Sequence, residues 1–134
     1  MAWGGGLLME KSLIQFLKSF FNLFRAEIDK ITIYSNEVIG TVGWPEEDDK
    51  QDFYWKIENW NIDFSKLSLL CNFISNKNLI NGDHITISYE ALLSRLIDAR
   101  WDSKDAKQSL DYLCSFEIKM IDDGEKTDSF YIHF

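Results

Sequence analysis

The sequence predicts an α+β domain in which an N-terminal amphipathic helix and a three-stranded antiparallel sheet precede three helices and a β-hairpin. Three observations support this prediction. Apolar residues near the start recur with helical spacing, residues 30–60 alternate between apolar and polar in segments rich in β-branched and aromatic side chains, and helical spacing returns after residue 60.

The chain length favours one domain. Its 134 residues, 46% of them hydrophobic, suffice for one core and are too few for two of ordinary size. We therefore expect a single domain over residues 9–134, with a helix-and-sheet part at 9–60 and a second part at 61–134. Residues 1–8 resemble a leader added by cloning or a disordered end, in which case Met9 is the native start.

The first helix is predicted over residues 7–28, where the apolar side chains cover one broad face. Phe residues on one side and cations elsewhere are typical of a core-facing helix and, less commonly, of a helix lying on a membrane surface. A membrane-spanning helix is excluded because Lys11, Lys18 and Arg25 interrupt the apolar run every seven residues.

Three strands should follow. Residues 30–34 and 37–44 predict a hairpin turning at Ser35 and Asn36, with Gly40 and Gly43 indicating a bulge or bend in its second strand. Residues 53–60 alternate again and predict the third strand. Between the last two lies an acidic segment, residues 46–52, which holds five carboxylates in seven positions and should be a solvated loop.

The second part begins with a helix capped by Asp63, followed by a polar loop at residues 76–82 and a short strand at 84–87. Ser88 should cap a second helix, and Ser103 a third over residues 103–115. Strands at 116–120 and 129–134 form the final hairpin, because the Asp-Gly dipeptide within residues 122–125 is a strong turn signal.

This order of elements over residues 63–134 resembles the winged-helix fold. In that family a three-helix core carries a β-hairpin wing, and its last helix enters the DNA major groove. The resemblance rests on the order and length of the elements and on no residue motif. It implies that residues 103–115 form the recognition helix and that residues 122–127 form the tip of the wing.

The side chains at those positions are mixed in charge. Acids such as Asp105 and Asp111 accompany the bases of the recognition helix, and the wing tip is mostly acidic. The basic side chains around the second and third helices can still form a strip that binds nucleic acid. The alternative interpretation is that these side chains form ordinary surface ion pairs, including Lys107 with Asp111. The candidate nucleic-acid-binding residues are Arg95, Arg100, Lys104, Lys107 and Lys126.

Net charge points to a different kind of partner. Fourteen Lys and Arg against 22 Asp and Glu give a formal charge of −8, which disfavours polyphosphates and favours a basic protein. Simple solubility is the alternative explanation. The candidate partner-binding surface combines the acidic segment with nearby aromatics, although these aromatics could equally belong to the core. Its residues are Glu46, Glu47, Asp48, Asp49, Asp52, Trp44, Tyr54 and Trp60.

No pattern in the sequence predicts an enzyme, a metal site or a cofactor. The two histidines, His84 and His133, are 49 positions apart in strand-like segments and should be structural. Cys71 and Cys114 lie in apolar runs, which favours two reduced core thiols and a cytoplasmic location. Adjacent carboxylates in a flexible loop are not held at the fixed separation that acid/base catalysis needs.

We therefore expect an acidic binding protein that occludes a basic partner. Its profile of size and charge is similar to that of small bacterial immunity or inhibitor proteins that neutralise a cationic toxin, often a nuclease. The first alternative is a winged-helix DNA-binding regulator. The second is a structural protein of mobile-element origin, whose Phe-rich first helix docks on a second copy to form a homodimer.

Overall fold

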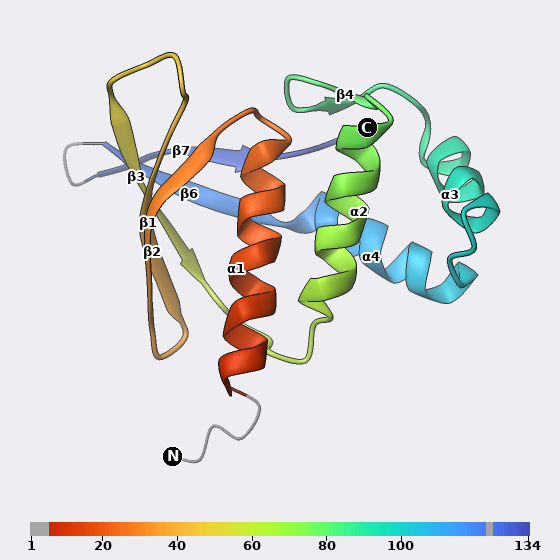
Figure 1. The fold of residues 1–134 in the computed structure, drawn as a ribbon, viewed down its shortest axis with the longest axis horizontal. Helices are drawn as coiled ribbons and strands as arrows, with labels where there is room; N and C mark the ends of the chain where they lie inside the picture. The colour runs from red at the N-terminus through yellow and green to blue at the C-terminus, as the bar shows by residue number, and fades with distance from the viewer. Residues whose placement is uncertain (1–5, 123–124) are drawn as a thin grey trace.

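The computed structural model describes residues 6–122 and 125–134, which form an α+β fold (Figure 1). Four helices accompany a five-stranded sheet and a small separate hairpin within these residues. In chain order the elements are α1 (Gly6–Asn22), β1 (Glu27–Tyr34), β2 (Glu37–Gly43), β3 (Lys50–Lys56), α2 (Phe64–Asn76), β4 (Ile80–Asn81), β5 (His84–Ile85), α3 (Tyr89–Asp98), α4 (Ser103–Ser115), β6 (Glu117–Asp122) and β7 (Glu125–Tyr131).

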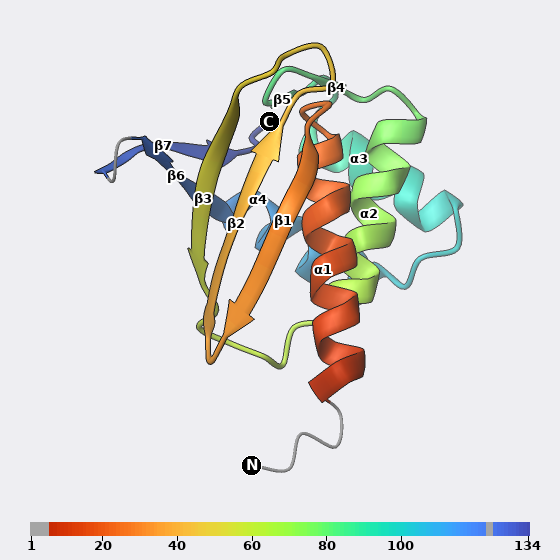
Figure 2. The same cartoon turned by 60° about the vertical axis from the view of Figure 1, so that its left-hand side comes forward.

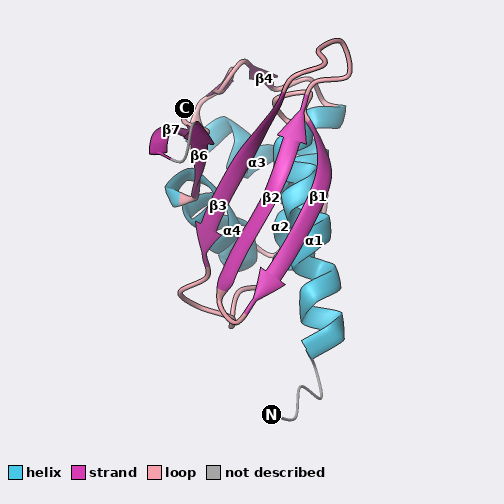
Figure 3. Cartoon of the chain, turned by 90° about the vertical axis from the view of Figure 1, so that its left-hand side faces the viewer, coloured by secondary structure: helices cyan, strands magenta, loops and turns pink. Residues whose placement is uncertain are grey.

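The sheet joins the two parts of the chain. Its strand order is β1-β2-β3-β6-β7 and every neighbouring pair is antiparallel. The link is the pairing of β3 with β6, which aligns Phe53 with Met120 and Tyr54 with Lys119. The final hairpin therefore continues the N-terminal sheet, and the parts predicted at 9–60 and 61–134 share one sheet and one core (Figure 3).

Helix α1 lies against one face of this sheet, and α2 packs beside α1 on the side away from β1 and β2 (Figure 2). Phe16, Phe20 and Phe21 of α1 are fully buried against the strands and the start of β6. The ring of Phe21 lies 5.0 Å from that of Phe53, and the ring of Phe16 lies 4.9 Å from that of Phe116. Because the Phe-rich face of α1 is used inside the chain, it is not available to dock on a second copy.

Helix α1 is shorter than predicted at its C-terminal end. It ends at Asn22 rather than near residue 28, because Arg25 adopts a left-handed conformation with φ 61° and the Ala26 amide donates to the Phe21 carbonyl at 3.0 Å. Helices commonly end in this way, and the left-handed residue is usually Gly. Because this helix uses Arg25 instead, the sequence did not indicate where the helix ends. At the other end α1 begins at Gly6, so residues 6–8 belong to the helix.

Strand β3 begins and ends earlier than predicted. It covers Lys50–Lys56 rather than residues 53–60, because Lys50, Gln51 and Asp52 pair with the last residues of β2. Backbone pairing thus outweighs the polar character of these side chains. The acidic segment is divided as a result: Glu46 to Asp49 form the connection, and Asp52 belongs to the strand.

The bulge lies in β1 and not at the glycines of β2. The register shifts between Ile28, which pairs with Val42, and Lys30, which pairs with Thr41, leaving Asp29 as the extra residue. Gly40 instead makes room for the ring of Phe53, since a Cβ at position 40 would lie 2.6 Å from Cζ of Phe53. The phenyl ring of β3 therefore crosses directly over the Gly40 backbone.

In the second part, most predicted elements are present with adjusted ends. Asp63 and Ser88 cap α2 and α3 by accepting from the amides of Lys66 and Ala91. The cap of α4 is Asp102 rather than Ser103, and its carboxylate accepts from two amides of the first turn at 3.1 and 3.2 Å.

The predicted polar loop at residues 76–82 contains β4, which pairs with β5 across a turn where Gly82 has φ 63°. The final hairpin is formed by β6 and β7, and its predicted turn at 123–124 lies outside the described residues. Of the helices in the described part of the chain, none combines the length and apolar content that crossing a bilayer requires.

Candidate partner-binding site

The connection between β2 and β3 presents four consecutive acidic residues to solvent. We call Glu46, Glu47, Asp48 and Asp49 the acidic loop; all four are exposed. The loop starts with a tight turn, in which the Glu47 amide donates to the Trp44 carbonyl at 2.9 Å, and Pro45 restricts the backbone between them. The carboxylates therefore project from a short connection that is tied at its first turn.

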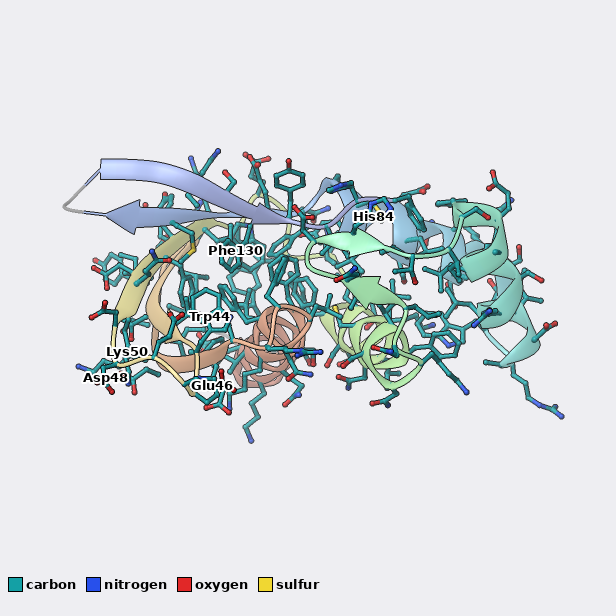
Figure 4. The ribbon with its side chains drawn as sticks, turned by 90° about the horizontal axis from the view of Figure 1, so that it is seen from above. Trp44, Glu46, Asp48, Lys50, His84 and Phe130 are labelled. Carbon is teal, nitrogen blue, oxygen red and sulfur yellow. The ribbon has the colours of Figure 1, made fainter. Side chains whose placement is uncertain are left out.

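Trp44 anchors this loop to the body of the protein. Its indole N–H donates a hydrogen bond of 2.9 Å to the Phe24 carbonyl, just beyond the end of α1. Its ring lies 5.9 Å from that of Phe130 in β7, which in turn lies 4.9 Å from Phe24 (Figure 4). Trp44 is half-buried, so part of the indole stays accessible beside the carboxylates.

The nearest cation along the chain is held away from the acidic loop. Lys50, the first residue of β3, forms an ion pair of 2.8 Å with Asp29, the bulged residue of β1. The hydrogen bond and charge of Lys50 hold the pKa of Asp29 below its ordinary value of 3.8. No ion pair to the four loop carboxylates is formed among residues 6–122 and 125–134.

Two hollows adjoin Trp44. The smaller, of about 240 Å³, lies between the start of β1 and the acidic loop, and its charged lining residues are Glu27, Asp29, Glu47 and Lys50. The larger, of about 520 Å³, lies at the C-terminal ends of α1 and α2 and is bordered by the β4–β5 turn. The smaller hollow therefore carries three carboxylates and one ammonium group.

The structure separates the other predicted site residues from this loop. Tyr54 lies near the far end of β3, where its hydroxyl donates to Glu37 at 2.6 Å, which raises the pKa of Tyr54. The far end of β3, at Lys56, lies about 20 Å along the strand from Lys50 at roughly 3.3 Å per residue, and Trp60 follows beyond it. Asp52 is exposed in β3 opposite Thr41. Trp44 and the acidic loop thus lie together, whereas Tyr54 and Trp60 lie further along the chain from them.

The candidate nucleic-acid-binding residues lie at the other end of the molecule, on α3 and α4. Lys104 and Lys107 are exposed one turn apart on α4, while Arg95 lies on α3 and Arg100 just after it. The side chain of Lys126 lies outside the described part. Lys107 and Asp111 do not form the expected ion pair, and Asp111 accepts from the Tyr89 hydroxyl at 2.8 Å. Lys66 of α2 instead pairs with Asp105 at 2.7 Å.

A groove beside α4 was not predicted from the sequence. Two adjoining hollows of about 570 and 590 Å³ share Ile62, Tyr112 and Ser115 and run between α4 and the segment before α2. Burial raises the pKa of Tyr112 to about 12. The groove arises because the β3–α2 connection crosses α4, a long-range contact with no local sequence signal.

The two thiols are protonated at neutral pH. Cys71 is buried in α2, and burial raises its pKa strongly. Cys114 is partly buried in α4, and burial raises its pKa to about 11. A thiol acts as a nucleophile or metal ligand through its thiolate, so neither cysteine has the environment of a reactive one.

Comparison with known proteins identifies no relative for this arrangement. No family model, curated protein or solved structure matches the chain.

Proposed function

We propose that this protein is a binding module that docks a basic protein partner through the acidic loop and Trp44. One observation carries the proposal: four exposed carboxylates are held next to a half-buried, anchored indole, while the adjacent cation Lys50 is paired with Asp29. An aromatic anchor flanked by charges is typical of protein recognition sites.

Electrostatics would bring such a partner to this surface. The formal charge of −8 attracts cationic proteins at long range, and the acidic loop concentrates four of these charges at one end of the sheet. At short range a Lys or Arg of the partner approaches Glu27 and Glu47 in the smaller hollow, which also contains the Lys50–Asp29 ion pair. A second cation lies over the exposed part of the indole, where a cation–π contact stabilises it.

Occlusion is the mechanism that fits such a surface. A nuclease binds phosphates through Lys and Arg, so a row of carboxylates competes with nucleic acid for the same side chains. On this proposal the partner is a basic protein such as a nuclease toxin. Inhibition is then stoichiometric and requires no chemistry from the inhibitor.

Site-specific photo-crosslinking tests the proposal. A photo-reactive amino acid at position 45, next to the acidic loop, should capture a basic protein in cells of the source organism. The matched probe at position 56 lies at the opposite end of β3 and should not capture it. Capture from position 56 alone would place the interface elsewhere.

The captured partner then allows a quantitative test with two charge-matched variants. The loop variant carries Glu46→Gln, Glu47→Gln, Asp48→Asn and Asp49→Asn. The control variant carries Glu58→Gln, Asp83→Asn, Glu90→Gln and Asp98→Asn, which are exposed acids elsewhere. Since both lose four charges, net charge alone predicts equal effects. We expect the loop variant to weaken binding on the order of 10- to 100-fold, and the control far less.

A second function is favoured by a different observation. The α2-β5-α3-α4-β6-β7 order resembles a winged helix, and α4 exposes Lys104, Lys107 and Gln108 on one face. On this alternative the chain binds duplex DNA at low salt, and Lys104→Gln with Lys107→Gln lowers the salt slope by about two. The control pair, Lys11→Gln with Lys18→Gln, leaves the slope unchanged. Absence of any DNA complex at low salt rules the alternative out.

A further inference from the structure

The two histidines of the chain lie side by side. His84 and His133 are 49 positions apart in sequence, yet their ring centroids are 5.2 Å apart and their planes are inclined by 66°. Both side chains are exposed. His84 lies in the small hairpin (Figure 4). Neither belongs to the acidic loop or to the hollows beside Trp44.

Backbone hydrogen bonds hold the pair in register. The segment after β7 forms a parallel bridge with β5, in which the Ile85 amide donates to the His133 carbonyl at 2.7 Å. The His133 amide donates to the Asp83 carbonyl at 3.0 Å. On the other side His84 pairs with Asn81 of β4. Directly paired residues of neighbouring strands project from the same face, so the two imidazoles are brought together before any ligand binds.

We propose that His84 and His133 form a binding site for a divalent transition-metal ion such as Zn²⁺, Ni²⁺ or Cu²⁺. Imidazole nitrogen is a preferred ligand of these ions. An ion about 2.0 Å from the coordinating nitrogen lies about 3.2 Å from the ring centroid, so two imidazoles on a tetrahedral ion have centroids roughly 5.2 Å apart. The observed centroid separation of 5.2 Å leaves room for one ion between the two rings, once rotation about the side-chain bonds directs a nitrogen of each imidazole at it.

The site is open rather than closed. In the described part of the chain, no group of three or more His, Cys, Asp and Glu side chains is placed to hold a metal ion. The two imidazoles therefore leave coordination positions for water or for a ligand from another molecule. Structural zinc sites use four protein ligands, so this one should bind weakly and exchange its ion readily.

Calorimetry with metal salts tests the site, using protein without a polyhistidine tag. We expect one Zn²⁺ or Ni²⁺ ion per chain and no binding of Mg²⁺, which prefers oxygen ligands. His84→Ala and His133→Ala should each weaken binding on the order of 100-fold, because the second imidazole binds intramolecularly. The acidic-loop amide variant should retain the wild-type affinity. Unchanged affinity in both histidine variants, or absence of zinc binding, overturns the proposal.

Two further measurements keep the test decisive if a variant folds poorly. In the wild type, Zn²⁺ should shift the imidazole NMR signals of both histidines together at the same metal concentration. A shift of one signal alone contradicts a shared site. Thermal unfolding should also respond, since Zn²⁺ at about a hundred times its Kd raises Tm by roughly 5–10 °C in the wild type and not in His84→Gln. Equal Tm shifts in the wild type and in His84→Gln would also contradict a metal site shared by the two histidines.

Discussion

The hydroxyl groups of Ser19 and Ser68 share a buried hydrogen bond of 2.8 Å where α1 packs against α2. Each serine is the other's partner inside this interface, whereas the other polar contacts between α1 and α2, Ser65 with Ser12 and Asn22 with Ser75, are exposed. We expect Ser19→Ala to lower the free energy of unfolding by about 1–3 kcal/mol, because the Ser68 hydroxyl is left buried without a partner. The double variant Ser19→Ala with Ser68→Ala should lose less free energy of unfolding than the two single variants lose in total, as measured by urea unfolding. Strict additivity would contradict the pairing.

Gly40 should tolerate no side chain. An alanine Cβ would lie 2.6 Å from Cζ of Phe53 and would also clash with the Lys30 carbonyl of the neighbouring strand. We expect Gly40→Ala to lower the free energy of unfolding by about 2 kcal/mol or more. Gly43→Ala is the control from the same strand, since its Cβ meets the flexible Lys50 side chain at 3.1 Å. Equal losses in the two variants would contradict the close approach of Phe53.

Trp44→Phe should remove one hydrogen bond while retaining most of the ring packing. The indole N–H that binds the Phe24 carbonyl is lost, and we expect a decrease of about 1 kcal/mol in the free energy of unfolding. Trp101→Phe is the matched control because the Trp101 indole makes no such bond within the described residues. Circular dichroism during urea unfolding measures both variants. An equal decrease in the free energy of unfolding of both variants would contradict the anchoring role of the Trp44 hydrogen bond.

The ion pair between Lys50 and Asp29 should be visible in the titration of the carboxylate. Lys50 lowers the pKa of Asp29 from 3.8 in the folded state. A lowered folded-state pKa contributes stability above pH 3.8, which is lost as the pH falls through the folded value. We expect Lys50→Met to return the pKa of Asp29 toward 3.8, measured by NMR of its carboxyl carbon. Lys30→Met should have a smaller effect, since the Lys50 hydrogen bond is the largest cause.

Tyr112 should destabilise the fold at high pH. Burial raises its pKa from 10.0 to about 12, so the folded state disfavours the phenolate. Its contribution to stability is present below pH 10 and is lost as the pH rises from 10 to about 12. Tyr112→Phe should therefore show a weaker loss of stability over that range, measured by urea unfolding at stepped pH. An unchanged pH dependence would show that other tyrosines dominate.

Local patterns explain which predictions were accurate. The caps at Asp63 and Ser88, the alternating strands and the final hairpin follow from spacing and turn chemistry within a few residues. Errors fall at positions that depend on distant partners and at local stops and caps that use an unexpected residue, such as the cap of α4 at Asp102. Strand β3 begins at Lys50 because β2 pairs with it, and α1 stops at a left-handed Arg25 that carries no glycine signal.

The candidate site was predicted in part for the same reason. The acidic loop follows from composition, and Trp44 follows because it is next to the loop in sequence. Tyr54 and Trp60 were grouped with the loop by closeness in sequence, but an extended strand carries them away from it. Asp29, Phe24 and Phe130 complete the site from distant segments, and no local pattern identifies them.

By itself, the sequence determined the types of the elements, the acidic surplus and the position of the acidic loop, because periodicity and charge are properties of neighbouring residues. Tertiary structure alone decided that β3 and β6 merge the two parts into one sheet, that Lys50 pairs with Asp29, and that the two histidines meet. The physical reason is the same in each case. Which strands pair depends on which distant segments come together to bury the core. That outcome is set jointly by many residues far apart in the sequence, so no local pattern reveals it.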